Sequence, residues 1–251
     1  MPIDEKFHAA YRQLETRMRA LAESDGDVFL PNPEPIAPVQ YVLICMEPSL
    51  GWWAKSADEA RSRVDAGFRN FLFSPEDFIL HFCAQRYLCG TGQRYFITDL
   101  SKGAMLVSRA GAARAERYDR WYALLLEELN LCATPDACIV AVGNVVSQQL
   151  LRRQFQRPFT RVIHYSGQAG PARRAGIVGH EASFQAFVGS VSLDDLVATA
   201  AATLEAAGVP QNIRDEALAR LAKSQLTVSR QQLIFNYKRA FEAMRVPVAI
   251  T

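Results

Sequence analysis

The stretch Val39-Gln40-Tyr41-Val42-Leu43-Ile44-Cys45-Met46, which runs into Glu47-Pro48-Ser49, decides the fold class of this 251-residue chain. A nearly continuous apolar run of this length predicts a strand that is buried on both faces, as in a parallel sheet. Ligands of such sheets bind where the carboxyl ends of the strands meet the loops. The loop that starts at Glu47 is therefore the first place to look for a functional site.

Three further apolar runs predict strands that end in polar residues. They cover residues 95–98, 138–142 and 161–163, and they end at Asp99, at Gly143-Asn144 and at His164. Helical patterns over residues 78–89, 117–131 and 145–155 separate the strands. This alternation predicts an α/β fold, a three-layer α/β/α sandwich with a central four-stranded parallel sheet.

The ends of the chain differ from this pattern. Apolar spacing predicts a helix over residues 5–23, and the four prolines between Pro31 and Pro38 predict an extended connector. Beyond Ser190 we expect helices only, over residues 193–207, 211–224 and 229–244. The sequence thus predicts an N-terminal helix and connector (1–38), an α/β domain (39–189) and a C-terminal helical subdomain (190–251).

Composition indicates a soluble, cytoplasmic protein. No run approaches the ~18 apolar residues of a membrane span, and the N-terminal residues lack the basic start and apolar core that are typical of a signal sequence. The five cysteines form no CxxC pair, so we expect buried thiols and neither a disulfide framework nor a metal site. We expect a monomer without contact to membranes.

The net charge of +2 hides an uneven distribution. No Asp or Glu occurs between Asp136 and Glu181, and a local excess of positive charge attracts phosphates. The alternative is an ordinary solvated surface. The arginines of this window are Arg152, Arg153, Arg157, Arg161, Arg173 and Arg174.

Over residues 39–187 the strand ends together resemble the uracil-DNA glycosylase superfamily. Its first motif, a strand followed by Gly-x-Asn-Pro-Gly or Gly-Glu-x-Pro-Gly, corresponds here to Cys45-Met46-Glu47-Pro48-Ser49. Its second motif, a strand that ends in Asn with a Lys downstream, corresponds to residues 95–102. Its third motif is a helix with Trp and Glu-Leu before an apolar strand, and its fourth is His-Pro-Ser. They correspond to Trp121, Glu128-Leu129, Pro135 and residues 139–143, and to His164-Tyr165-Ser166.

Two departures from the family pattern indicate a divergent member. No cysteine quartet accompanies the first motif, so we expect no iron-sulfur cluster and no other cofactor. Tyr165 stands where relatives have the proline that fixes the backbone before the serine.

The resemblance implies a catalytic pair, Glu47 and His164. Cleavage of an N-glycosidic bond develops positive charge on the sugar and negative charge on the departing base. Glu47 would stabilise the sugar cation or activate water, and His164 would donate a ring N–H to the base. The alternatives are a carboxylate that caps a helix and a structural histidine.

Asp99 is the clearest indication of the substrate. The superfamily's uracil readers place Asn at this position, whereas a carboxylate only accepts hydrogen bonds and suits the N4 amino group of cytosine. The alternative is an N-cap that is turned away from the pocket.

Further residues are candidates for contacts to the nucleotide. Trp52 and Trp53 would stack on a sugar attached to the base, or would simply anchor their loop. One of Phe68, Phe71 and Phe73 would stack on the flipped base. The candidates for DNA phosphate contacts are Ser166, Gly167, Arg173, Arg174 and Lys102.

Together, these residues predict a monofunctional DNA glycosylase. Its expected partner is DNA, in which it would leave an abasic site. The expected substrate is a modified cytosine such as glucosylated hydroxymethylcytosine, which bacterial anti-phage members of the superfamily remove from phage DNA. The alternatives are a uracil repair glycosylase and a catalytically inactive nucleic-acid-binding module with the same fold.

Overall fold

The computed structural model describes residues 5–51, 53–106 and 114–245, and the chain forms two compact units. The first takes in the chain up to Asn70 together with Phe96–Ala141 and Val145–Thr160. The second comprises Phe71–Tyr95, Val142–Asn144 and the chain from Arg161 onward. The units thus alternate along the sequence, whereas the sequence pattern predicted consecutive segments.

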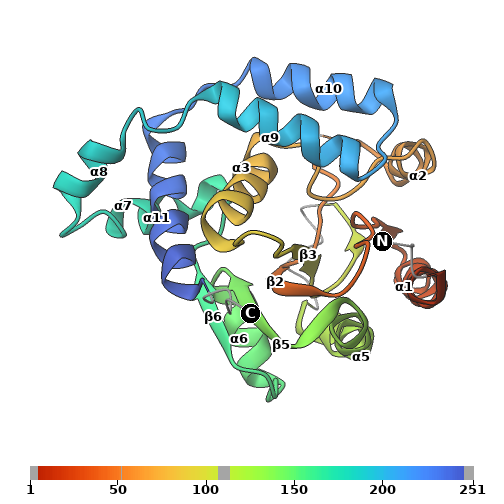
Figure 1. Ribbon diagram of the computed structural model, residues 1–251. Coiled ribbons are helices and arrows are strands. Elements are labelled where there is room, and N and C mark those ends of the chain that lie inside the picture. Colours follow the sequence, from red (N-terminus) through yellow and green to blue (C-terminus); the bar gives the residue numbers. More distant parts are fainter. Residues whose placement is uncertain (1–4, 52, 107–113, 246–251) are drawn as a thin grey trace. The chain divides into compact units, whose positions relative to one another are not determined.

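The four predicted strands form one parallel sheet in the order β3-β2-β5-β6 (Figure 1). In β2 (Val39–Cys45), Val42 lies opposite Ile139 of β5 (Ala133–Val142). β5 begins five residues before the predicted start, because Thr134-Pro135-Asp136 interrupts the apolar run on which the prediction rested. The outer strands are β3 (Tyr95–Asp99) and β6 (Phe159–Val162).

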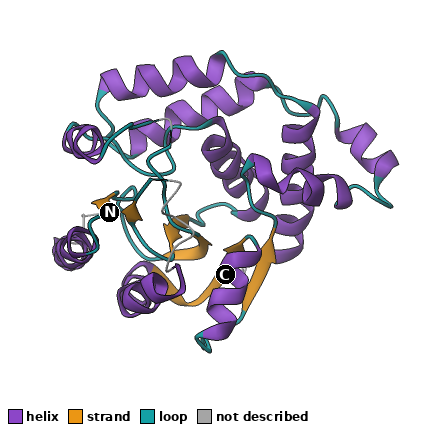
Figure 2. Cartoon of the chain, turned by 180° about the vertical axis from the view of Figure 1, so that it is seen from behind, coloured by secondary structure: helices purple, strands orange, loops and turns teal. Residues whose placement is uncertain are grey.

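The central strands are buried on both faces. Val42 and Ile44 of β2 belong to the same core cluster as Ile139 of β5, and these side chains share one face of the sheet. Leu43 and Val140 project to the other face and are equally buried. The expected α/β class is therefore confirmed, with a parallel sheet that is flanked by helices (Figure 2).

Two long helices pack against each other in the first unit. Phe7 and Tyr11 of α1 (Glu5–Ser24) share a core with Tyr118 and Leu125 of α5 (Arg114–Cys132). The apolar spacing had predicted both helices. The other elements here are β1 (Val28–Phe29), α2 (Ala57–Asp65), β4 (Gly103–Ala104) and most of α6 (Asn144–Arg152).

Helices make up most of the second unit. The segment predicted as one helix over residues 78–89 is α3 (Pro75–Cys83) followed by a π-helical turn, Ala84–Leu88. α3 starts earlier than predicted because Ser74 and Asp77 form a capping box ahead of the apolar residues. The other helices are α7 (Gly170–Ala175), α8 (Glu181–Phe187), α9 (Leu193–Ala206), α10 (Gln211–Ala222) and α11 (Val228–Met244).

The three C-terminal helices have the predicted positions to within about two residues, and α9 and α10 lie side by side (Figure 1). α9 packs on α3, and α11 packs on α3, α7 and α8. The five cysteines are free thiols. Among the helices described, none has the length and apolar character needed to cross a membrane.

Candidate functional site

Glu47 lies at the end of β2, where two residues of α5 hold its carboxylate. The Nη2 atom of Arg114 is 2.7 Å from Oε1, and the hydroxyl of Tyr118 donates to Oε2. Only 2% of the Glu47 side chain is exposed. Glu47 does not cap α2, whose N-cap is Ser56. The helix-cap alternative is therefore wrong, and Glu47 is a buried acid with two defined partners.

Burial raises the pKa of Glu47 above its ordinary value, because the ionised form loses its hydration. The positive charge of Arg114 opposes this effect and lowers the pKa, as does its hydrogen bond. The carboxylate thus gives up its proton less readily than an exposed glutamate and, once ionised, faces a fixed cation.

Asp99 lies at the end of β3, the strand next to β2. It is buried, and its Oδ2 accepts a hydrogen bond of 2.7 Å from Nδ2 of Asn70. Nδ2 of Asn70 also donates to Oδ1 of Asn32, and Asn32 in turn donates to the carbonyl of Ile97. The chain after Asp99 continues into β4 and not into a helix, so the N-cap alternative is wrong.

Asn32 and Asn70 escaped the sequence analysis. Asn32 lies between two prolines of the connector, and Asn70 follows the phenylalanine and arginine at 68–69. The only local signal is an amide side chain within an otherwise apolar or proline-rich segment. Their hydrogen bonds to the region around Asp99 depend on tertiary contacts that such a signal cannot reveal.

Burial raises the pKa of Asp99 well above its ordinary value. Lys102 lowers this pKa, whereas the nearby carboxylates of Glu128 and Glu47 raise it. The ends of β2 and β3 thus place two acids within electrostatic reach of each other. An ionised Asp99 only accepts hydrogen bonds, as expected from the sequence. A protonated Asp99 can also donate one.

Lys102 does not reach the surface. Its ammonium lies 2.9 Å from Oε1 of Glu128 and donates to Oγ1 of Thr98 at 2.7 Å. The hydroxyl of Thr98 donates to the other Glu128 oxygen. Because Lys102 is only 1% exposed and already paired, we no longer assign it a phosphate contact.

His164, in the second unit, has a defined tautomer. The backbone N–H of Ser166 donates to Nδ1 at 3.0 Å, so the ring proton of the neutral imidazole is on Nε2. Burial, with a smaller effect from the charge of Arg173, lowers the pKa of His164 to about 4. At neutral pH the ring is therefore uncharged and has one N–H to donate, as the predicted role requires.

Arg173 holds the His164 loop together from inside. Its guanidinium donates to the carbonyls of Tyr165 and Ser166 and to Oγ of Ser229, and the residue is 3% exposed. The Tyr165 ring stacks on His164 with 4.7 Å between ring centroids. These contacts fix the loop. Arg173 is thus a positioning residue, and we withdraw it as a phosphate contact.

Gly143 gives a test of this loop. Its φ is +100°, and a Cβ at this position would lie 3.1 Å from both Cβ and Cδ2 of His164. We expect Gly143→Ala to lower the free energy of unfolding by about 1–3 kcal/mol, through backbone strain and displacement of His164. Gly92→Ala is the matched control, because Gly92 also has a positive φ but nothing within 4 Å. Equal losses in urea unfolding would show that the contact with His164 is irrelevant.

The predicted aromatic contacts that fall on described residues are buried within the protein. Trp53 stacks on Phe68 at 4.7 Å and donates its indole N–H to the carbonyl of Ser49, so it anchors its loop. Phe71 and Phe73, in the second unit, are both buried. Trp52 lies outside the described residues. None of these rings is singled out as the one that stacks on a base.

Most of the arginines in the acid-free window have structural partners. Arg153 pairs with Asp119, Arg157 donates to three backbone carbonyls, and Arg161 donates to Asn144. Arg174 remains exposed, as does Gly167, and Ser166 is half-buried. Of the predicted phosphate contacts, these last three stay candidates.

No family model, no curated protein and no solved structure matches this chain. The features that indicate a function are the motifs at the strand ends and the geometry of the two groups around Asp99 and His164.

Proposed function

We propose that this protein is a DNA glycosylase that hydrolyses the bond between a base and its deoxyribose. The observation that carries the proposal is the pair of buried acids, Glu47 and Asp99, at the ends of adjacent parallel strands. Each acid has a raised pKa and its own polar partners. Buried acids with shifted pKa values are typical of catalytic sites, because burial without a function is costly.

In the proposed reaction a water oxygen bonds to C1′ of the sugar while the C1′–N bond breaks. The bonding electrons leave with the base, and His164 donates a hydrogen bond from Nε2 to the oxygen on which negative charge develops. The ionised Glu47 orients the water and takes its proton. The products are an abasic site and a free base, in a reaction that we expect to take place in the cytoplasm.

The substrate that we propose is a modified cytosine, such as glucosylated hydroxymethylcytosine in phage DNA. Because Oδ2 of Asp99 accepts from Asn70, Oδ1 is the atom left for the base. When Asp99 is ionised, Oδ1 accepts a hydrogen bond from the N4 amino group of cytosine and repels O4 of uracil. This discrimination would make Asp99 the residue that reads the base.

Uracil is a second candidate substrate, because the raised pKa of Asp99 favours its protonated form. With the proton on Oδ1, Asp99 would donate to O4 of uracil. Protonation of one oxygen thus decides between the two bases.

The test uses synthetic DNA, duplex and single-stranded, that carries uracil, cytosine, hydroxymethylcytosine or its glucosylated form. After incubation, alkali cleaves the strand wherever a base has been released. We expect strand scission at the glucosylated base. Scission at uracil alone would replace the first candidate by the second, and no scission with retained DNA binding would indicate a binding module without catalysis.

The change Asp99→Asn should shift the base preference towards uracil. Asn70 would still donate to the side-chain oxygen at this position, which leaves the new amide to donate to the base. We expect the ratio of uracil excision to excision of cytosine-type bases to rise about 5- to 150-fold. This factor corresponds to ~1–3 kcal/mol of discrimination between the bases. Asp136→Asn, the same change at an exposed residue, is the control. An unchanged ratio in the Asp99 variant would remove it from base recognition.

A further inference from the structure

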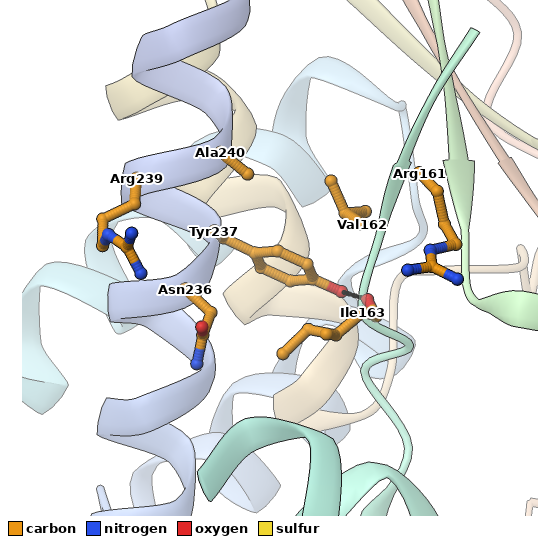
Figure 3. Close-up of a pocket in the computed structure, with 7 residues that line it drawn as sticks. All are labelled: Arg161, Val162, Ile163, Asn236, Tyr237, Arg239 and Ala240. Atoms are coloured by element: carbon orange, nitrogen blue, oxygen red, sulfur yellow. Dashed lines mark hydrogen bonds between the residues drawn. The ribbon is translucent and has the colours of Figure 1, made fainter. Parts of the chain in front are cut away.

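The second unit contains a cavity of about 260 Å³ between the end of β6 and α11 (Figure 3). One side of the cavity is lined by the last residues of β6 and the residue that follows it, and the other side is lined by one turn of α11. The lining residues are Arg161, Val162, Ile163, Asn236, Tyr237, Arg239 and Ala240. None of them belongs to the groups around Glu47 or Asp99.

The charge of the cavity is positive. The guanidinium groups of Arg161 and Arg239 lie on opposite sides of the Tyr237 ring (Figure 3), and no lining residue is acidic. The polar partners of these guanidiniums are an amide, a backbone carbonyl and a histidine ring. Arg161 donates to Oδ1 of Asn144, and Arg239 donates to the carbonyl of Gly176 and lies 2.6 Å from Nε2 of His180. Within the described part of the chain, neither arginine forms an ion pair with a carboxylate.

The size of the cavity limits the ligand. Sites for whole small molecules are ~300–1,000 Å³, so this cavity suits a small anion or one group of a larger molecule. Guanidinium groups bind phosphate through charge and through paired N–H donors. We propose that this cavity binds a phosphate group and that Arg161 and Arg239, one on each side, supply the positive charge that attracts it.

The cavity wall continues directly into the His164 loop. The hydroxyl of Tyr237 donates to the carbonyl of Ile163 at 2.9 Å, and Ile163 precedes His164 in the chain. A phosphate bound here would therefore lie beside the loop that presents His164. If the proposed function is right, the bound phosphate belongs to a DNA strand, and this part of the inference rests on that function. Inorganic phosphate or a free nucleotide would supply the same phosphate group.

The first test measures the affinity for duplex DNA at several salt concentrations. Each phosphate contact contributes ~0.9 to the slope of log Kobs against log salt. We expect Arg161→Gln combined with Arg239→Gln to reduce the slope by ~0.9, the contribution of the one phosphate that the cavity is proposed to hold. Lys223→Gln, at an exposed residue of the same unit, is the control for loss of charge. The double Arg→Lys variant keeps the charge and should retain most of the slope.

The second test titrates inorganic phosphate and follows the side-chain Nε–Hε resonances of Arg161 and Arg239 by NMR. Shifts in these resonances with an unchanged DNA slope would support the site and identify a small anion as its ligand. No shift, together with equal slopes for the double Gln variant and the Lys223 control, would overturn the inference.

The two proposals fail independently. If no base is released from any substrate but the double variant still loses its slope or its phosphate response, the phosphate site stands without the glycosylase. If bases are released but the arginines affect neither DNA nor phosphate binding, the glycosylase stands without this site.

Discussion

Replacing Glu47 by Gln should lower the rate of base release by about 10²- to 10⁴-fold, the usual contribution of a positioned acid or base. Glutamine has nearly the same size and keeps an oxygen that can accept from Arg114, while its amide nitrogen takes the place of the oxygen that Tyr118 contacts. It cannot carry the negative charge that the sugar cation needs, or accept the proton of the water. Single-turnover excision on the best substrate measures the effect, and DNA affinity should stay near that of the unaltered protein.

The pH dependence gives an independent check of Glu47. Because burial raises its pKa, the active ionised form is lost at a higher pH than for an exposed glutamate. The rate should therefore be high above this raised pKa and fall as the pH falls through it. The residual rate of Glu47→Gln should lack the part of this decrease that comes from Glu47, whereas a decrease caused by protonation of Asp99 should remain. His164, with a pKa of about 4, stays neutral over most of this range.

Glu116→Gln is the matched control, since it makes the same chemical change at an exposed residue of the first turn of α5. It should leave both the rate and its pH dependence unchanged. Equal rates for the Glu47 and Glu116 variants would exclude Glu47 from the mechanism.

Replacing Glu128 by Ala should lower the free energy of unfolding by about 3–5 kcal/mol, because it leaves the ammonium of Lys102 buried without its counter-charge. Both side chains are almost completely buried, at 2% exposure for Lys102 and 1% for Glu128. Urea unfolding followed by circular dichroism measures the loss. The neighbouring change Glu127→Ala is the control, because Glu127 pairs with Arg17 at an exposed position and should matter little.

A double replacement, Lys102→Met with Glu128→Leu, removes both charges together and should recover much of the lost stability. If Glu128→Ala costs no more than Glu127→Ala, the buried pair does not contribute to stability as we infer. The experiment also tests the withdrawal of Lys102 as a phosphate contact, because the double replacement should leave the salt dependence of DNA binding unchanged.

The sequence by itself determined the fold class and the positions of the strand ends. Apolar runs such as residues 39–46 report burial along one strand, and burial on both faces follows from the absence of alternation. The same information placed Glu47, Asp99 and His164 at the ends of strands. It failed where polar residues interrupt a run, as at the start of β5, or where a cap extends a helix, as at Ser74.

Only the tertiary structure decided what these side chains contact. Glu47 pairs with Arg114, 67 residues away, and Asn70 donates to Asp99 across 29 residues. The packing also shows that Lys102 and Arg173, expected as surface cations, are buried and have partners within the protein. Periodicity records whether a position is buried, but the partner of a buried polar group depends on which distant segment packs beside it. The sequence therefore located the candidate site, and the packing of the elements assigned its chemistry.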